Sequence, residues 1–404
     1  MSRTPYRPNS RRPSFVRLPP STFILLESVS TAPHYPVIGL KIRTQATMTS
    51  SKETITAVVA EQLSSMSLGE SGERKGNDET EPTTSNGTTP TKLLCSACEK
   101  KSDSLMKCRA CKCVWYCDKD CQDKHWEEHK KECKRIKSIL DQRGGKLVVG
   151  TEKDVGPLGK LPPREECPIC MRVFPLDPAL RTYANCCGNM ICGGCIFQHQ
   201  MTRGEQADTC AFCRAAAPGS DEEILALRRK RIELNDPKAL YNMALNYDNG
   251  AYGLAVDQVK CIDLLRQSAA FGYPFSQYQL GMYHYHGMMG LEQNEEEALK
   301  LWEKAAEGGH LTSRNNLGAI AYGNGDRVAT MRHWRLSAAG GFRGSMEGLI
   351  VNFEDGLLHH GDLAKTLQAM YRSRAEMKSE GRDQHIKHLK EIGEYQGEYD
   401  LHSN

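Results

Sequence analysis

Residues 95–133 read CSACEKKSDSLMKCRACKCVWYCDKDCQDKHWEEHKKEC. The stretch contains two pairs of cysteines separated by two residues, followed by further cysteines and a histidine. Two intervening residues let a tight turn aim both sulfurs at one tetrahedral ion about 2.3 Å away, and two such pairs complete its shell. Because a closed shell leaves no position for water or substrate, the pattern predicts a metal that stabilises the fold, not one that catalyses a reaction.

A second stretch, residues 167–213, repeats this pattern with cysteines alone. Together the two stretches hold sixteen of the 17 cysteines of the chain, and each supplies enough ligands for two sites. Structural zinc contributes on the order of 10–16 kcal/mol of apparent binding energy to small fingers. The alternative is disulfide bonding, which we disfavour because we find no convincing secretory signal. We therefore expect zinc as the cofactor.

The first stretch closely resembles the MYND zinc finger. It shows the CxxC, CxxC, YC, CxxxC and HxxxC spacings of that family, with Trp115, Tyr116 and Trp126 at the positions of its packing aromatics. The resemblance implies two interleaved zinc sites, one formed by Cys95, Cys98, Cys117 and Cys121, the other by Cys108, Cys111, His129 and Cys133. It also implies binding of partners, commonly short proline-containing peptides, and no catalysis by the finger alone.

Two further potential ligands lie within the same stretch. The run from Asp120 to Cys133 lacks Gly and Pro, which predicts a helix with His129 and Cys133 one turn apart. Cys113 and His125 lie four residues before other ligands. Since a tetrahedral site closes at four ligands, we expect Cys113 to be a spare thiol and His125 to be a helix-surface residue.

The second stretch, CPICMRVFPLDPALRTYANCCGNMICGGCIFQHQMTRGEQADTCAFCR (167–214), resembles an all-cysteine RING finger. The cross-brace scheme of that family implies two sites, one formed by Cys167, Cys170, Cys192 and Cys195, the other by Cys186, Cys187, Cys210 and Cys213. The commonest RING register would instead use Cys187 and Asn189, and an amide is a poor zinc ligand. Vicinal cysteines require a contorted peptide, so we expect the second site to be the weaker one.

The RING resemblance raises the question of ubiquitin ligase activity. Such fingers often dock a ubiquitin-conjugating enzyme, and Ile169 occupies the apolar docking position while Arg214 occupies the position of the bridging cation. An aliphatic side chain buries well, and a guanidinium donates hydrogen bonds in a fixed fork. Against activity, the last pair reads CAFC where CPxC is frequent. No catalytic nucleophile is expected on this chain, and a purely structural interaction module is the alternative.

From residue 236 the sequence repeats itself at about 37 residues, which is typical of stacked helical hairpins. Units begin at Ala239, Ser276, Ser313 and Ser345, each followed four residues later by Met or Leu. The ends of the second helices read QSAAFG, EKAAEG and LSAAGG, where the final glycine suits a left-handed helix cap. The pattern resembles Sel-one-like repeats, relatives of tetratricopeptide arrays, whose concave surface implies protein or peptide clients.

The remaining segments are less informative. Residues 1–47 are Arg-rich, as in an organelle transit peptide, but Pro19 and Pro20 interrupt any amphipathic helix and Met48 offers a second start. We expect disorder or a targeting segment over 1–92, a linker over 136–164 that is entered through a basic helix, KRIKSILDQ (134–142), and a charged helix over 374–404 that caps the array. No stretch suits a membrane span. With 53 basic and 50 acidic residues, a nucleic-acid-binding role is disfavoured.

The expected fold is therefore a multidomain chain with two small zinc modules, MYND at 93–135 and RING-like at 165–216, and an all-α repeat solenoid at 234–373. The function expected is zinc-dependent protein interaction, extended to ubiquitin ligation if a conjugating enzyme docks at Ile169 and Arg214; a non-catalytic scaffold is the alternative. The expected compartment is the cytoplasm or the nucleus. The sequence leaves the client and the conjugating enzyme open.

Overall fold

The computed structural model describes residues 94–102, 104–144, 158–161, 164–203 and 208–395, together with the backbone of two short strands. These strands, β1 (Leu26–Ser28) and β2 (Ile38–Leu40), pair antiparallel. The rest of the segment 1–92, where disorder or a targeting sequence is expected, lies outside the described residues. None of the described helices is long and apolar enough to cross a bilayer.

Each cysteine-rich stretch folds around one antiparallel strand pair. In the first, β3 (Met106–Lys107) pairs with β4 (Trp115–Tyr116), and helix α2 (Lys119–Gln142) follows. In the second, a short 3-10 turn precedes β5 (Arg181–Ala184), which pairs with β6 (Asn189–Cys192), and α3 (Gly193–Arg203) follows. Such small modules have almost no apolar core, so their stability has to come from elsewhere.

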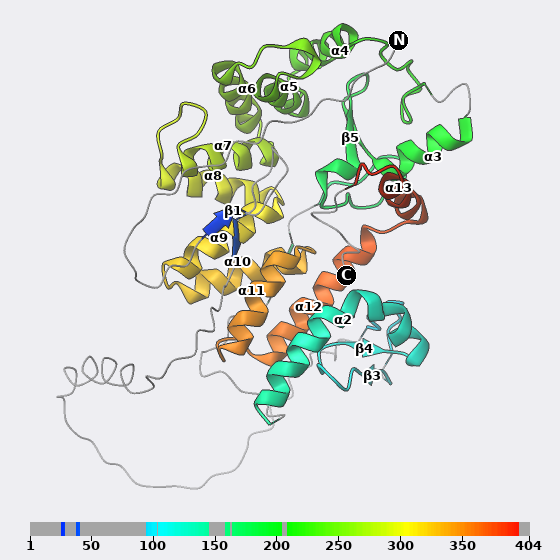
Figure 1. Ribbon diagram of the computed structural model, residues 1–404, viewed down its shortest axis with the longest axis vertical. Helices are drawn as coiled ribbons and strands as arrows, with labels where there is room; N and C mark the ends of the chain where they lie inside the picture. Colours follow the sequence, from blue (N-terminus) through cyan, green and yellow to red (C-terminus); the bar gives the residue numbers. More distant parts are fainter. Residues whose placement is uncertain are drawn as a thin grey trace, which may run out of the picture. The chain divides into compact units, whose positions relative to one another are not determined.

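The repeat region is entirely helical, with consecutive helices packed as antiparallel hairpins that lie side by side (Figure 1). Helix α4 (Asp221–Glu233) precedes the array. The four predicted units correspond to four helix pairs: α5 (Pro237–Asn249) with α6 (Gln258–Ala270), α7 (Pro274–His286) with α8 (Glu295–Glu307), α9 (Leu311–Gly323) with α10 (Arg327–Ala339), and α11 (Arg343–Glu354) with α12 (His360–Glu376).

The predicted glycine caps are found in two of three repeats. Gly272 and Gly341 have φ angles of 78° and 111°, in the region that glycine tolerates without steric cost. In the second repeat the left-handed residue is Gly309, with φ 94°, and Gly308 stays at −71° as the helix C-cap. The prediction was wrong there by one residue, because α8 ends at Glu307, one residue beyond its paired alanines.

The glycine in each LG motif of the repeats has a packing role. Gly281 of α7 faces Trp302 of α8, and Gly318 of α9 faces Trp334 of α10. Both indoles are buried and donate their Nε1–H to a backbone carbonyl of the preceding helix. A methyl group would therefore occupy space that the ring already fills, which explains why a residue with poor helix propensity stands in mid-helix.

Replacing Gly318 by alanine is expected to destabilise the array by about 1–3 kcal/mol, the usual cost of overpacking a core. The added Cβ would lie 2.4 Å from Cδ1 of Trp334. Gly323→Ala in the same helix is the matched control, since a Cβ there meets nothing within 4 Å, and we expect it to be neutral or stabilising by up to about 1 kcal/mol. Chemical denaturation followed by circular dichroism measures both; equal effects would contradict the packing argument.

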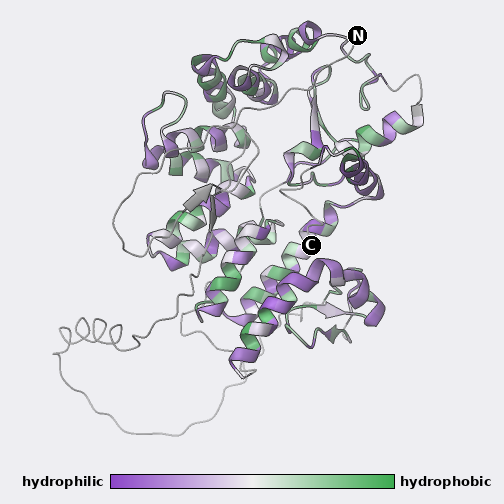
Figure 2. Cartoon of the chain, in the orientation of Figure 1, coloured by the Kyte–Doolittle hydropathy of each residue, from purple (hydrophilic) through white to green (hydrophobic). Residues whose placement is uncertain are grey.

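The two segments that follow the finger and the repeats differ in outcome. The basic helix predicted at the start of the linker is present as the end of α2, which reaches Gln142 because Ile136, Ile139 and Leu140 are buried in the same apolar cluster as residues of α11 and α12. The C-terminal segment forms α13 (Glu380–Glu391), which is mainly hydrophilic (Figure 2) and packs against α3 of the second zinc module. It was expected to cap the repeat array, so that expectation was wrong.

Candidate metal centres and docking groove

Four clusters of potential metal ligands stand out in the described part of the chain. In each cluster all ligand atoms lie within 4.8 Å of one another, as a tetrahedral ion requires. The clusters are Cys95, Cys98, Cys117 and Cys121; Cys108, Cys111, His129 and Cys133; Cys167, Cys170, Cys192 and Cys195; and Cys186, Cys187, Cys210 and Cys213. These sets have the same members as the predicted ones. All 17 cysteines are free thiols, so the disulfide alternative finds no support.

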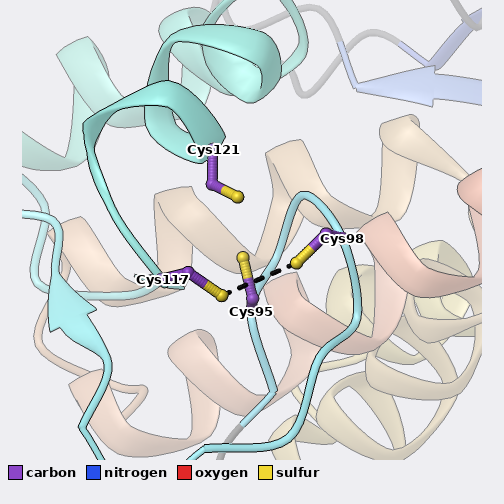
Figure 3. Close-up of side chains that lie close together, drawn as sticks. All are labelled: Cys95, Cys98, Cys117 and Cys121. Atoms are coloured by element: carbon purple, nitrogen blue, oxygen red, sulfur yellow. Dashed lines mark hydrogen bonds between the residues drawn. The ribbon is translucent and has the colours of Figure 1, made fainter.

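The first cluster joins the start of the module to the beginning of α2 (Figure 3). Cys95 and Cys98 come from the loop before β3, Cys117 directly follows β4, and Cys121 lies in the first turn of α2. The sulfurs of Cys98 and Cys117 are 3.6 Å apart. Asp118 is the N-cap of α2 and accepts a hydrogen bond from the backbone N–H of Cys121 at 2.8 Å, which fixes the direction in which that thiol points.

The second cluster is completely buried and draws its ligands from the β3–β4 turn and from α2. Cys108 and Cys111 flank the turn, while His129 and Cys133 lie one helical turn apart, as predicted. Nε2 of His129 is 3.3 Å from Sγ of Cys111, and the sulfurs of Cys108 and Cys133 are 3.7 Å apart. Hydrogen bonds from Cys111 and Cys133 lower the pKa of Cys108, and the same bonds raise the pKa of Cys111 and of Cys133, so Cys108 is the first thiol of the three to ionise.

Four cysteine pairs share one backbone turn, although they belong to different modules. In each, the residue after the second cysteine has a positive φ and donates its N–H to the carbonyl of the first cysteine. These residues are Glu99 (φ 59°), Lys112 (57°), Met171 (53°) and Arg214 (62°). A left-handed conformation costs a non-glycine residue about 1–2 kcal/mol. This conformation occurs after all four of these pairs. It indicates that the four turns have the same task, and binding of one metal ion by both thiolates of a pair is such a task.

The residues present fit zinc. Thiolates and an imidazole in closed sets of four are its preferred ligands in structural sites. In such a site the metal would supply cross-links, and the chain would hold it through one Cys3His cluster and three all-cysteine clusters. Binding displaces protons from the thiols, so affinity falls as the pH falls.

Cys113 and His125 both lie beside the second cluster without belonging to it. Cys113 is completely buried, and its Sγ is 3.3 Å from Nε2 of His360 in α12. His125 was expected on the helix surface, and this prediction was wrong: it is only 7% exposed, stacks on His129 and lies 3.1 Å from the hydroxyl of Tyr116. The surface of α2 that carries it is covered by α12, so burial and the neighbouring His129 lower the pKa of His125 to about 4.

The two clusters of the second module differ in burial. Sγ of Cys167 lies 3.9 Å from that of Cys195, and Cys170 lies 3.8 Å from Cys192, in a largely buried set. In the other cluster Cys213 is exposed and its sulfur is 3.4 Å from that of Cys186. Vicinal Cys186 and Cys187 both reach this cluster from a turn in which Cys187 and Gly188 (φ 74°) donate their N–H groups to the carbonyl of Ala184.

Ile169 and Arg214, the two residues predicted to dock a conjugating enzyme, line one open groove of about 520 Å³. Ile169 is 40% exposed and Met201 of α3, also on the groove, is 70% exposed. The Arg214 guanidinium donates a hydrogen bond to Nδ1 of His199 at 2.7 Å. Because Arg can only donate, Nδ1 is the unprotonated nitrogen, and Nε2 therefore carries the hydrogen that it donates to the carbonyl of Thr209 at 3.1 Å.

Sequence reasoning missed the residues of α12 that contact the first zinc module. Tyr371, Gln368 and His360 are hydrogen-bonded to ligands of the second cluster or to residues beside it. Burial and the neighbouring Glu132 raise the pKa of Tyr371 well above its usual value, so its hydroxyl keeps its proton. More than 200 positions separate these partners, and no spacing rule links residues so far apart in the sequence.

Comparison with family models places two known modules in the chain. Residues 95–133 match the MYND finger, and residues 237–272 and 274–310 match Sel1 repeats. Two solved structures are similar to part of the chain. The Sel1 repeat protein from Oxalobacter formigenes is 27% identical, with 31% of this chain and 96% of that one covered and a TM-score of 0.29. The protective antigen c5321 of uropathogenic Escherichia coli is 19% identical, with 49% and 47% covered and a TM-score of 0.30.

Curated relatives align over a length close to that of the finger. The histone-lysine N-methyltransferase ASHR1 of Arabidopsis thaliana is 38% identical over 63 residues, or 16% of this chain and 13% of that protein. The human histone-lysine N-methyltransferase SMYD3 is 41% identical over 46 residues, or 11% of each chain. The chain thus spans little more than a tenth of the length of these relatives. It contains a MYND finger and Sel1 repeats, which makes it a zinc-binding protein built from protein-interaction modules.

Proposed function

We propose that this chain is a ubiquitin ligase of the RING type that recruits clients through its MYND finger and helical repeats. The observation that carries the proposal is that Ile169 and Arg214 share one groove with the exposed side chain of Met201. Exposed apolar residues beside a cation are what a protein-docking surface needs, since the apolar groups supply affinity and the guanidinium supplies directed hydrogen bonds. On this proposal the reactive cysteine belongs to the conjugating enzyme.

The modules have separate tasks in this scheme. The RING-like module, 165–216, binds the conjugating enzyme, while the MYND finger, 93–135, and the repeats, 234–373, hold the client. The sixteen clustered residues are proposed to hold four zinc ions that fix both fingers. On the MYND finger, Met106 and Trp126 are exposed, and Lys107 lies over the ring of Trp115 at 4.9 Å. Exposed aromatic and apolar groups of this kind suit proline-containing peptides.

A non-catalytic scaffold is the second candidate, and the hydrogen bond between Arg214 and His199 favours it. One N–H group of the Arg214 guanidinium already donates a hydrogen bond to the imidazole of His199 at 2.7 Å. A partner protein that needs this N–H group has to compete with that bond. In the ligase scheme the same bond has another meaning, because it fixes the direction in which the guanidinium presents its remaining donors.

Replacing Ile169 by alanine is expected to reduce ubiquitin chain formation about 5- to 30-fold, because an aliphatic anchor of a docking surface is worth about 1–2 kcal/mol. The assay combines the purified full chain with activating enzyme, a panel of conjugating enzymes, ubiquitin and ATP. Arg214→Ala is expected to lower the rate at saturating conjugating enzyme, and Ile169→Ala to raise the concentration needed.

Met171→Ala is the matched control for this assay. Met171 follows the same cysteine pair and is 69% exposed, but it does not line the groove, so its loss should leave the rate unchanged. If the unaltered chain builds no ubiquitin conjugates with any conjugating enzyme while its zinc content is complete, the ligase proposal is lost and the scaffold remains.

A further inference from the structure

The second metal cluster has a polar contact that reaches it from the far end of the chain. Nδ1 of His129 lies 3.2 Å from the hydroxyl of Tyr371 in α12, and this hydroxyl lies 3.1 Å from Oε2 of Glu132 in α2. All three side chains are buried: His129 is 0%, Tyr371 3% and Glu132 5% exposed. Buried polar groups are costly unless they are paired, so these bonds are not incidental surface contacts.

His129, Tyr371 and Glu132 form a row of hydrogen-bonded side chains, and the direction of both hydrogen bonds follows from Glu132, the last member of this row. The Glu132 carboxylate has only acceptor oxygens, and its Oε1 forms an ion pair with Nε of Arg343 at 3.4 Å. The Tyr371 hydroxyl therefore donates to Glu132 and accepts through its oxygen. Nδ1 of His129 must then carry the hydrogen, which leaves the lone pair on Nε2, the nitrogen 3.3 Å from Cys111 Sγ in the cluster.

The surroundings hold this row in one geometry. The ring of Tyr371 stands edge-on to His129 and to His125, with interplanar angles of 85° and 89°. Beside it, α12 makes two bonds to the backbone of the ligand turn: His360 Nε2 lies 2.9 Å from the carbonyl of Cys111, and Gln368 donates to the carbonyl of Cys113 at 2.7 Å. The helix thus contacts both the histidine ligand and the cysteine turn.

We propose that Tyr371 and Glu132 form the outer shell of the Cys108–Cys111–His129–Cys133 site, so that the last hairpin of the repeat array sets the metal affinity of the finger. Metal-bound histidines commonly donate their second N–H to a carboxylate or carbonyl, which fixes the tautomer and makes the ligand nitrogen more basic. Here His129 donates to the hydroxyl of Tyr371, and this hydroxyl donates in turn to the carboxylate of Glu132. Tyr371 acts through His129 and is a positioning residue.

This inference concerns the finger and the array, and it does not depend on ligase activity. Its consequence is that the finger is not an independent module. The helix that contacts its zinc site belongs to the region that would hold a client, so separation of α12 from the finger would weaken metal binding. The other three clusters have no such row of histidine, tyrosine and carboxylate among the described residues, and they serve as internal references.

The test is Tyr371→Phe in the full chain, which keeps the ring and removes only the hydroxyl. We expect zinc affinity at this one site to fall about 10- to 100-fold, the usual effect of losing an outer-shell partner. Zinc is removed by graded chelator competition and counted by native mass spectrometry. Alkylation of the freed thiols then locates the loss, which should appear first at Cys108, Cys111 and Cys133.

A matched control is Tyr283→Phe, which removes another buried tyrosine hydroxyl, 3.4 Å from Asp248 and away from every cluster. It should leave all zinc affinities unchanged. Glu132→Gln is expected to weaken the same site, and the double variant with Tyr371→Phe should lose no more than the more affected single variant, because both act through one row. If Tyr371→Phe does not fold, Glu132→Gln alone is judged by the same criteria.

Three results would contradict the proposal. One is zinc affinity at this site within twofold of the unaltered chain. Another is a loss spread equally over all four clusters, which would mean general destabilisation. Additive losses in the double variant would likewise separate Tyr371 from Glu132 and remove the shared row.

Discussion

Cys111→Ser is expected to reduce the zinc content from four ions per chain to three and to unfold the MYND finger locally. Structural zinc in such fingers contributes on the order of 10 kcal/mol at neutral pH, more than a module with so small a core can lose. A serine hydroxyl is a poor substitute, because zinc prefers thiolate and imidazole. Native mass spectrometry gives the count, and hydrogen exchange along α2 reports the unfolding.

Cys113→Ser is the control that makes this result specific. Cys113 lies only two residues away and is as deeply buried, yet it is outside the cluster. Its replacement should leave the count at four. Loss of zinc from both variants would mean that the ligand set is wrong, and a count of three in the unaltered chain would point to the Cys186–Cys187 site.

Trp334→Ala is expected to destabilise the repeat array by about 3–5 kcal/mol, the usual cost of removing a buried tryptophan. The indole lies between Gly318 of α9 and Gly348 of α11 and stacks on Tyr322. Its loss therefore opens a cavity at the joint between the third and fourth helix pairs. Urea denaturation followed by circular dichroism measures the free energy of unfolding.

Val328→Ala, on the same helix α10, provides the comparison. Val328 is 70% exposed, so its change should stay within about 0.5 kcal/mol of zero. Because the MYND finger shares an apolar cluster with α11 and α12, Trp334→Ala should also increase hydrogen exchange in α2. Unchanged exchange there would show that the finger and the array unfold separately.

Local spacing predicted the individual ligand pairs, and the resemblance to MYND and RING fingers implied which pairs share an ion. A CxxC pair closes by a single turn, and His129 and Cys133 meet because four residues make one helical turn. The repeats were equally accessible, since the LG and AAxxG motifs encode close helix packing. At the end of α8 the left-handed cap residue is Gly309 and not the predicted Gly308.

The failures share a different cause. His125 was assigned to the surface, and α13 to the array, because each prediction considered only one segment of the chain. Whether a helix face is covered depends on which distant element meets it. Arg382 of α13 illustrates this, since its guanidinium lies 3.5 Å from Cys170 Sγ and also bonds the carbonyl of Val173, yet nothing in its sequence neighbourhood indicates a metal cluster.

The sequence by itself determined the CxxC turns and the helical hairpins, because each follows from contacts between residues close in the chain or from one repeated pattern, and the resemblance to MYND and RING fingers implied which pairs share an ion. Only the tertiary structure decided that α12 covers the MYND finger, that Tyr371 links His129 to Glu132, and that His199 holds Arg214. Burial and hydrogen-bond direction at these places depend on side chains brought together by folding, which no local pattern in the chain encodes.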